Sequence, residues 1–409
     1  MELAGINHYL TYTYVPAPLS AVRGVAKLPP AHFLVWRDGQ VDVRRYWSLE
    51  FPVDGATSPK SDGELAEELR HQLIDAVKVR LVGERPLGAF LSGGLDSSAV
   101  VAAMRQAGAS DISTFSIGFA DEAYNELPYA RRVAAQYETD HHELIVEPDI
   151  EDLLPRLAAM FDEPYADSSA IPTWHLAKMA RQDVVVALNG DGGDEALGGY
   201  QHYQISMRAP QFTFPRSGSR ALQLAGAHLR RRAGDRIVLD KLAKAALMLG
   251  ETTPARRFGR FNAYFHPEEK LKSASPQFTN VIRSHDSLGI IEEIWREYRD
   301  SDLANRLMGI DIRSYLPGDL LPKVDITTMN VSLEARSPFL DHHLLEWAAA
   351  IPGERKIRQG KSKYLLKVAL EGWIDHDLIH RTKHGFGIPV ADWLRGPLRE
   401  MAYDLLTDK

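Results

Sequence analysis

The sequence contains no cysteine, which excludes disulfides, thiolate metal sites and any cysteine nucleophile. It also has no basic excess, because 48 Lys and Arg stand against 55 Asp and Glu and give a formal net charge of -7. Nucleic acid is therefore not an expected partner, whereas a small molecule is. No apolar run approaches the roughly 20 residues that cross a bilayer, and no basic and then hydrophobic leader follows Met1. We expect a cytoplasmic protein with no membrane partner.

The most informative stretch is residues 91–98, which read LSGGLDSS and are called here the phosphate loop. An apolar run at 85–90 precedes it and another at 99–104 follows it, so the order is strand, glycine turn, helix. Two glycines let the backbone approach a ligand, and the amides of a helix N-terminus then face an anion. The pattern predicts a phosphate cradle, although it is neither a Walker A loop nor a dinucleotide fingerprint. An ordinary turn with a Ser or Asp helix cap is the alternative.

Hydrophobic periodicity around this loop predicts alternating strands and helices. Such alternation is typical of an α/β fold in which helices flank a parallel sheet, and ligands bind at the carboxyl ends of the strands. Small or polar residues stand at three such ends, at Ser92-Gly93, at 116–118 and at Asn189-Gly190, and we expect these ends to converge. The expected helices are 63–81, 96–107, 125–137, 149–161 and 172–181, and the expected strands are 85–90, 112–119, 143–146 and 184–188.

The regions on either side of this alternation differ from it. Residues 32–36 and 41–47 flank Asp38-Gly39, a turn signal that predicts a β-hairpin. A connector at 52–61, rich in Pro, Gly, Ser and Asp, places a boundary near residue 57. Beyond residue 200 helical periods dominate. We therefore expect a hairpin segment at 1–57 and a domain at 58–409, with a nucleotide core at 58–200 and a mainly helical part at 201–409.

A second loop follows the last expected strand of the core. Asp191, Asp194 and Glu195 crowd three carboxylates among glycines, and such groups repel one another unless they share a cation or a proton. Mg²⁺ suits the site because it takes one or two protein carboxylates together with water and nucleotide phosphates. A solvated acidic turn is the alternative, and the register of an EF-hand is absent. Together the two loops predict ATP and Mg²⁺ as ligands.

Both loops, in this order, resemble those of the ATP pyrophosphatase (PP-loop) superfamily, and specifically the synthetase domain of the asparagine synthetase B family. The resemblance implies an adenine nucleotide α-hydrolase-like fold, and residues 1–57 resemble the end of the family's glutaminase domain with its linker. The agreement spans almost the whole chain. Further matching strings lie at 162–172, 315–325, 332–341 and 381–386.

The resemblance implies a two-step reaction. A carboxylate, aspartate in the family, attacks the α-phosphorus of ATP and releases pyrophosphate; ammonia then displaces AMP and leaves an amide. It assigns Mg²⁺ to Asp96 and Asp194, the pyrophosphate contact to Lys383 and the general base to Asp191. The base is one methylene shorter than the family's glutamate, and Asn189 replaces the usual serine. The ATP contacts implied are Leu91, Ser92, Gly93, Gly94, Asp96, Ser97, Ser98, Ser116, Ile117, Gly118, Asn189 and Gly190.

The family's glutaminase begins with a cysteine nucleophile, which this sequence lacks. Ammonia is therefore expected from solution, from a separate glutaminase subunit or from a missing N-terminal domain. Whether the protein forms a homodimer also stays open. Two other functions also stay open: a relative that forms a different amide, such as a β-lactam, a macrolactam or the amide of a sugar or peptide, and a catalytically silent module that binds nucleotide.

Overall fold

Two structural units share the chain. The computed structural model describes residues 1–83, 85–119, 125–146, 150–209, 215–233, 237–381, 390–396 and 398–407. One unit, called here the helical unit, comprises 1–57, 198–315 and 349–362. The other, called the sheet unit, comprises 58–197, 316–348 and 363–409. The chain passes from one unit to the other after residue 57, and residues 316–348 and 363–409 of the expected helical part belong to the sheet unit. The expected domains, with 1–57 as a glutaminase remnant, stay predictions.

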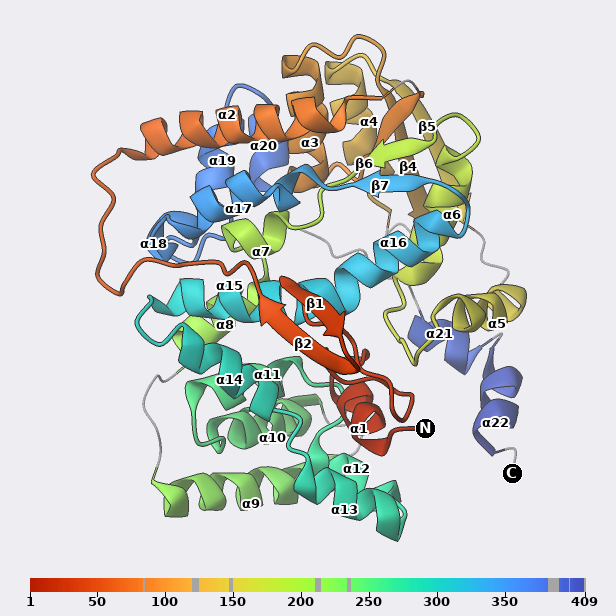
Figure 1. Ribbon diagram of the computed structural model, residues 1–409, viewed down its shortest axis with the longest axis vertical. Coiled ribbons are helices and arrows are strands. Elements are labelled where there is room, and N and C mark those ends of the chain that lie inside the picture. The colour runs from red at the N-terminus through yellow and green to blue at the C-terminus, as the bar shows by residue number, and fades with distance from the viewer. Residues whose placement is uncertain are drawn as a thin grey trace. The chain divides into compact units, whose positions relative to one another are not determined.

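The sheet unit is built on a parallel sheet of five strands in the order β5-β4-β3-β6-β7 (Figure 1). The chain leaves the central β3 toward β4 and β5, then crosses back to add β6 on the other side of β3. In such sheets ligands bind where the strand order reverses, at the carboxyl ends. The expected α/β fold with a parallel sheet is confirmed. The strands are β3 (Leu87–Phe90), β4 (Ser113–Phe119), β5 (Asp140–Val146), β6 (Val186–Leu188) and β7 (Glu334–Arg336).

Helices cover both faces of this sheet because successive side chains of a strand point to opposite faces. Phe115 and Ile117 of β4 belong to the core that also holds Trp174 of α6. Gly118 points the other way, toward α4, where a Cβ would lie 2.5 Å from a Leu127 methyl. Figure 1 shows α2 to α4 on one side of the sheet, with α6 and α16 on the other.

The helices of the sheet unit begin and end where local chemistry predicts. Ser61 and Glu64 form a reciprocal capping box at the start of α2, whose buried face is the predicted apolar stripe. The helical segments are α2 (Asp62–Arg80), α3 (Leu95–Gln106), α4 (Leu127–Gln136), α5 (Ile150–Met160), α6 (Ala170–Ala180), α7 (Gly193–Leu197), the π-helical turn η2 (Leu316–Leu320), α16 (Leu321–Met329), the 3₁₀ turn η3 (Pro338–Leu340), α17 (His342–Ala349), α19 (Tyr364–Leu370), α20 (His376–His380), α21 (Val390–Arg395) and α22 (Arg399–Thr407).

The helical unit contains the predicted hairpin, with β1 (His32–Arg37) antiparallel to β2 (Gln40–Arg45). Asp38 and Gly39 both have positive φ, 52° and 77°, as a tight hairpin turn requires. The helices of this unit are α1 (Leu3–Tyr12), α8 (Gln201–Arg208), α9 (Arg216–Ala233), α10 (Ile237–Leu249), α11 (Pro254–Asn262), α12 (Pro267–Ser273), α13 (Pro276–Ser284), α14 (Gly289–Glu297), α15 (Leu303–Arg313) and α18 (Gly353–Lys356).

Two strands depart from the expectations. β5 begins at Asp140, before the expected start at 143, and β7 was not expected at all. β7 spans three residues, two of them charged, and Arg336 pairs with Glu334 at 2.7 Å. So short and polar a strand has no alternating pattern to reveal it. No helix among the described residues has the length and apolar character to cross a bilayer.

Candidate active site

The phosphate loop joins the carboxyl end of β3 to the first turn of α3. Gly93 has φ +67°, and a Cβ there would lie 2.6 Å from the backbone nitrogen of Ala130, so only glycine fits. Ser92 and Ser97 close the turn: the Ser92 amide donates to Ser97 Oγ at 3.1 Å, and the Gly94 amide donates to Ser92 Oγ at 3.2 Å. The loop is thereby held in one shape at a helix N-terminus, as an anion cradle requires.

The acidic loop, residues 189–195, follows β6 and lies directly against the phosphate loop. A Cβ on Gly190 would stand 2.7 Å from Asp96 Cβ and 2.8 Å from the Ser97 amide nitrogen, and one on Gly193 would collide with the Asp96 carboxylate. The predicted convergence of these two strand ends is therefore confirmed. The glycines let the two loops approach without an intervening side chain.

Lys363 lies between the two carboxylates that the family resemblance assigns to magnesium. Its ammonium pairs with Asp194 at 2.7 Å and also with Asp96, and its side chain is 4% exposed. Burial lowers the pKa of Lys363, but Asp194 and Asp96 more than offset that effect, so its pKa is raised above the ordinary value. Lys363 precedes α19 with φ +51°. The sequence alone left open whether Lys361 and Lys363 face the phosphates or the solvent, and Lys363 was not among the predicted site residues.

The predicted base, Asp191, is positioned by Asn189. The Asp191 amide donates to Asn189 Oδ1 at 3.3 Å, and Ser337 Oγ donates to the same oxygen at 2.5 Å. The residue that replaces the family's serine thus organises the loop. A buried lysine, Lys323, lies close enough to Asp191 to feel its charge. Burial lowers the pKa of Lys323, whereas Asp167 and Asp191 raise it, with a net rise.

Lys323 itself is held by the segment before α6. Its Nζ lies 2.9 Å from Asp167 Oδ2 and 2.9 Å from Ser169 Oγ. Burial raises the pKa of Asp167, but Lys323 and Ser169 more than compensate, so that pKa is lowered. Both members of this pair are therefore charged at neutral pH, beside Asp191. Asp167 and Lys323 lie in two of the strings that match the family, 162–172 and 315–325, but neither residue was expected to have a role.

Arg381 also contacts the phosphate loop, at Gly93. Its Nη2 donates to the Gly93 carbonyl at 3.2 Å and pairs with Glu126 at 2.7 Å, and its guanidinium lies 4.2 Å from the Tyr129 ring centre. The planar guanidinium group of Arg381 thus binds the Gly93 carbonyl and the Glu126 carboxylate at the same time. Arg381 begins the string that contains Lys383. Lys383 falls in 382–389, outside the described residues, so its predicted pyrophosphate contact stays a prediction.

The end of β4 supplies the residues expected to contact adenosine. Ser116 Oγ donates to the Leu91 carbonyl, which ties β4 to the start of the phosphate loop. Gly118 shares the Ser116 face of the strand, whereas the Ile117 side chain belongs to the core on the opposite face. Any contact of Ile117 with a ligand on the phosphate-loop side therefore falls to its backbone.

The donor set fits a magnesium–nucleotide complex. Ser98 Oγ and Asn189 Nδ2 are buried and make no hydrogen bond to any described residue, so they are available to a polar ligand. Asp96 and Asp194 flank one shared cation, and their side chains are 15% and 13% exposed. Mg²⁺ takes one or two carboxylates of this kind together with phosphate oxygens. Asp96 and Asp194 are therefore suitable ligands.

Comparison with known proteins agrees with this geometry. The model of the asparagine synthase family matches residues 68–409. A glutamine-hydrolysing asparagine synthetase of Bacillus subtilis is 30% identical over 100% of this chain and 62% of its own length. A putative glutamine-hydrolysing asparagine synthetase of Mycobacterium bovis is 32% identical over 97% of this chain and 60% of its own length. The chain belongs to the asparagine synthase family.

Other similarities are more distant. An amidase of Penicillium rubens is 26% identical over 94% of this chain and 62% of its own length. The solved structure of an ammonia-dependent NAD synthetase from Campylobacter jejuni covers 57% of this chain and 97% of its own, with 12% identity and a TM-score of 0.25. This asparagine synthase family chain therefore spans about three fifths of the length of the curated relatives that it matches.

Proposed function

We propose that the sheet unit is an ATP-dependent, AMP-forming ligase that makes an amide from a carboxylate. The observation that carries the proposal is the cluster of Asp96, Asp194 and Lys363 at the switch point of the sheet, where the phosphate loop and the acidic loop meet. A cation shared by two carboxylates beside an anion cradle suits the handling of magnesium and phosphates. Membership of the asparagine synthase family supports the same reaction.

In the first step, an oxygen of the substrate carboxylate attacks the α-phosphorus of ATP, and the bond to the bridging oxygen of pyrophosphate breaks. The phosphate-loop amides and the hydroxyls of Ser97 and Ser98 bind the phosphates, and Arg381 holds the Gly93 carbonyl in place. Lys363 supplies fixed positive charge where negative charge develops on the leaving group. A magnesium ion on Asp96 and Asp194 would add further positive charge for the phosphates.

In the second step, the nitrogen of ammonia attacks the acyl carbon, one of its protons passes to the Asp191 carboxylate, and AMP leaves with the bonding electrons. Asn189 fixes the Asp191 backbone, and Lys323 balances the negative charge of the carboxylate before the proton arrives. A general base must come within about 2.6–3.2 Å of the proton that it accepts, directly or through one water. The shorter aspartate therefore favours transfer through a water molecule.

Aspartate is the substrate that we propose first, because the relatives that span the chain are named asparagine synthetases. Lys323 and its partner Asp167, beside Asp191, offer one positive and one negative charge. Such charges suit the carboxylate and the ammonium group of an amino acid. A different carboxylate is the second candidate, since an amidase also matches 94% of the chain. The two candidates share the adenylation step and differ in the acyl pocket.

The nitrogen source that we propose is a glutamine-hydrolysing domain or subunit. The relatives are named as glutamine-hydrolysing and are longer than this chain. Phe33, Leu34, Trp36 and Val41 of the hairpin are each more than 40% exposed, an apolar surface suited to a protein partner. Co-elution with a separately expressed glutaminase, lost on Trp36→Ser, would support the proposal, and failure to associate would refute it.

A substrate panel tests the ligase directly. Pyrophosphate and AMP are measured with ATP, Mg²⁺, ammonium and one carboxylate at a time, with Asp194→Asn as the inactive control. We expect aspartate to give pyrophosphate, AMP and asparagine in equal amounts. If only another carboxylate gives pyrophosphate, the proposed ligase activity stands, and that carboxylate takes the place of aspartate as the proposed substrate. Binding of ATP without pyrophosphate from any carboxylate would favour a silent nucleotide-binding module.

A further inference from the structure

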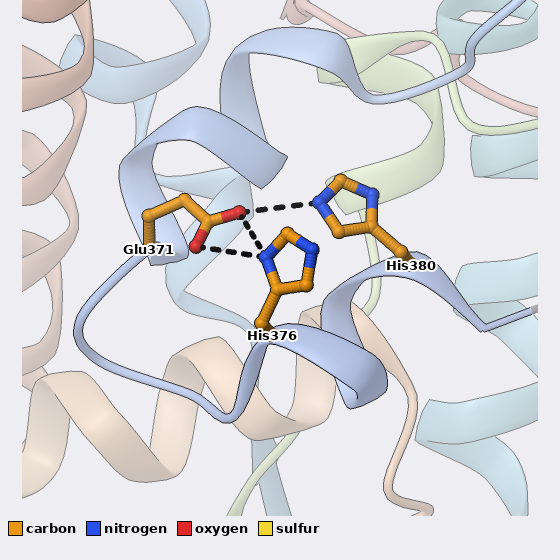
Figure 2. Close-up of side chains that lie close together, drawn as sticks. All are labelled: Glu371, His376 and His380. Atoms are coloured by element: carbon orange, nitrogen blue, oxygen red, sulfur yellow. Dashed lines mark hydrogen bonds and ion pairs between the residues drawn. The ribbon is translucent and has the colours of Figure 1, made fainter.

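Three side chains that play no part in the reaction meet on the surface of the sheet unit. Glu371 follows α19, and His376 and His380 stand one turn apart on α20 (Figure 2). Glu371 Oε1 lies 3.1 Å from His376 Nδ1 and 3.1 Å from His380 Nε2. One ligand atom from each of the three residues lies within 4.8 Å of the others. All three groups thus present their metal-binding atoms to one point.

The separations suit a small divalent ion. A tetrahedral zinc ion with bonds of about 2.0–2.1 Å has ligand atoms about 3.3 Å apart, close to the spacing between carboxylate and imidazoles here. Residues at i and i+4 of a helix share one face, so the two imidazoles lie on the same side of α20. Two imidazoles and one carboxylate form a donor set that suits zinc, copper or nickel better than Mg²⁺ or Ca²⁺.

The backbone holds Glu371 in position before any ion binds. Arg70 Nη2 donates to the Glu371 carbonyl at 2.7 Å, and Gln136 Nε2 donates to the Trp373 carbonyl at 2.7 Å. These contacts join the turn between α19 and α20 to α2 and α4. A turn held in this way loses little freedom when an ion binds, which favours affinity.

The acidic neighbours are already engaged elsewhere. Arg132 pairs with Asp377 at 2.6 Å and with Asp375 at 2.9 Å, which leaves Glu371 as the carboxylate that faces the histidines. The side chains of His376, His380 and Glu371 are 74%, 41% and 45% exposed, so an ion can enter from solvent. A tetrahedral ion with three protein ligands keeps a fourth position for water.

We propose that Glu371, His376 and His380 bind a divalent transition-metal ion of the zinc class. In each neutral imidazole the proton moves to the other ring nitrogen, so that His376 Nδ1 and His380 Nε2 each give a lone pair to the ion, and metal bonds replace the carboxylate–imidazole contacts. The ion ties α19 to α20, and residues of the candidate active site flank these two helices. Lys363 precedes α19, and Arg381 follows α20.

The test uses the full chain, stripped of metal and free of nucleotide. Zn²⁺ binding is measured by calorimetry, and Co²⁺ is titrated while its visible absorption is recorded, since tetrahedral Co²⁺ absorbs far more strongly than hydrated Co²⁺. We expect one site in the wild type, loss of that site in the double variant His376→Ala/His380→Ala, and affinity at least tenfold weaker in Glu371→Gln. Zn²⁺ should also raise the thermal unfolding midpoint of the wild type but not that of the double variant.

His342 and His343 provide the matched control, because they are adjacent histidines of the same unit with ring centres 3.9 Å apart. The variant His342→Ala/His343→Ala should bind one Zn²⁺ as the wild type does. Circular dichroism of the metal-free variants shows whether each is folded. Unchanged Zn²⁺ affinity in folded His376→Ala/His380→Ala, or no saturable Zn²⁺ binding by the wild type, would overturn the proposal.

Discussion

Buried lysines in the two units differ in their partners. In the sheet unit, Lys363 and Lys323 each pair with a carboxylate, and the pKa of each is raised. In the helical unit, Lys356 hydrogen bonds to the amide oxygen of Asn305, and burial lowers its pKa to about 7. Among the described residues, the hydrogen-bond partners of Lys270 are neutral oxygens of Asn7, Thr11 and Ser287, and burial lowers its pKa to about 8.

The difference separates two uses of the same residue type. A lysine that faces carboxylates stays charged, which suits a site that handles phosphates and anions. A lysine surrounded by neutral oxygens approaches neutrality near physiological pH and serves packing and hydrogen bonding. Burial alone therefore does not mark a lysine as a candidate for function, whereas burial beside carboxylates at the end of a strand does.

The largest effect is expected from Lys363→Met. This change leaves Asp96 and Asp194 facing each other without a cation, which should cost about 3–5 kcal/mol of unfolding free energy. It should also lower AMP formation by roughly 100-fold or more, the usual effect of losing a fixed charge in a reaction site. Urea unfolding and AMP release measure the two effects. Lys361→Met removes an exposed lysine two residues away and should change stability by about 0.5 kcal/mol or less.

Lys323→Met is expected to have the next largest effect. It leaves Asp167, whose side chain is 18% exposed, without its partner, which should cost about 3 kcal/mol. Because the folded pKa of Lys323 is raised, the stabilisation is complete below the unfolded pKa of about 10.4 and is lost only above it, so the cost should not vary across neutral pH. Adding Asp167→Asn should recover part of the loss in a double-mutant cycle. Additive costs would show that the pair is not coupled.

Lys356→Met should behave differently because its effect depends on pH. With a folded pKa of about 7 and an unfolded pKa of about 10.4, the unfolded wild type binds more protons between these values. Wild-type stability should therefore gain up to about 1.4 kcal/mol per pH unit from this group across that window, and the variant lacks the gain. Urea unfolding at about pH 6, 7.5 and 9 should show that the unfolding free energy of the variant falls further below that of the wild type as the pH rises. A difference independent of pH would contradict the lowered pKa.

The smallest effect is expected from Thr11→Val, which removes one neutral oxygen from Lys270. The variant loses the hydrogen bond from Lys270 Nζ, which should cost about 1 kcal/mol, and also the bond that Thr11 Oγ1 donates to the Asn7 carbonyl. Thr407→Val is the matched control, because Thr407 Oγ1 makes the same contact to the carbonyl four residues earlier but is exposed. Thermal unfolding of both variants measures the difference. Equal small effects would mean that the Lys270 contact adds nothing.

Local sequence patterns predicted much of the fold. The strand-turn-helix order around the phosphate loop, the hairpin at Asp38-Gly39 and the alternating core elements all have signals within a few residues, and the structure confirms these elements. The parallel sheet follows from that alternation, because a crossover helix lies between consecutive strands.

Features that depend on distant parts of the chain were not predicted. Lys363 is 267 residues from Asp96 in the sequence, and nothing in its neighbours indicates that they meet. Arg381 and Glu126 are likewise 255 residues apart. β7 is too short for an alternating pattern, and it is recognisable only through its pairing with β6. Such contacts arise from packing of the whole unit, whereas sequence periodicity reports single elements.

Exchange of labelled pyrophosphate into ATP tests the central claim most directly, because it reports the adenylation step without an amine donor. The wild type with Mg²⁺ and aspartate, or another carboxylate from the panel, should incorporate label only when the carboxylate is present. Folded Asp194→Asn should incorporate almost none, whereas Lys361→Met should match the wild type. Exchange that is independent of any carboxylate, or undiminished in Asp194→Asn, would contradict the assignment of the phosphate loop, the acidic loop and Lys363 to carboxylate adenylation.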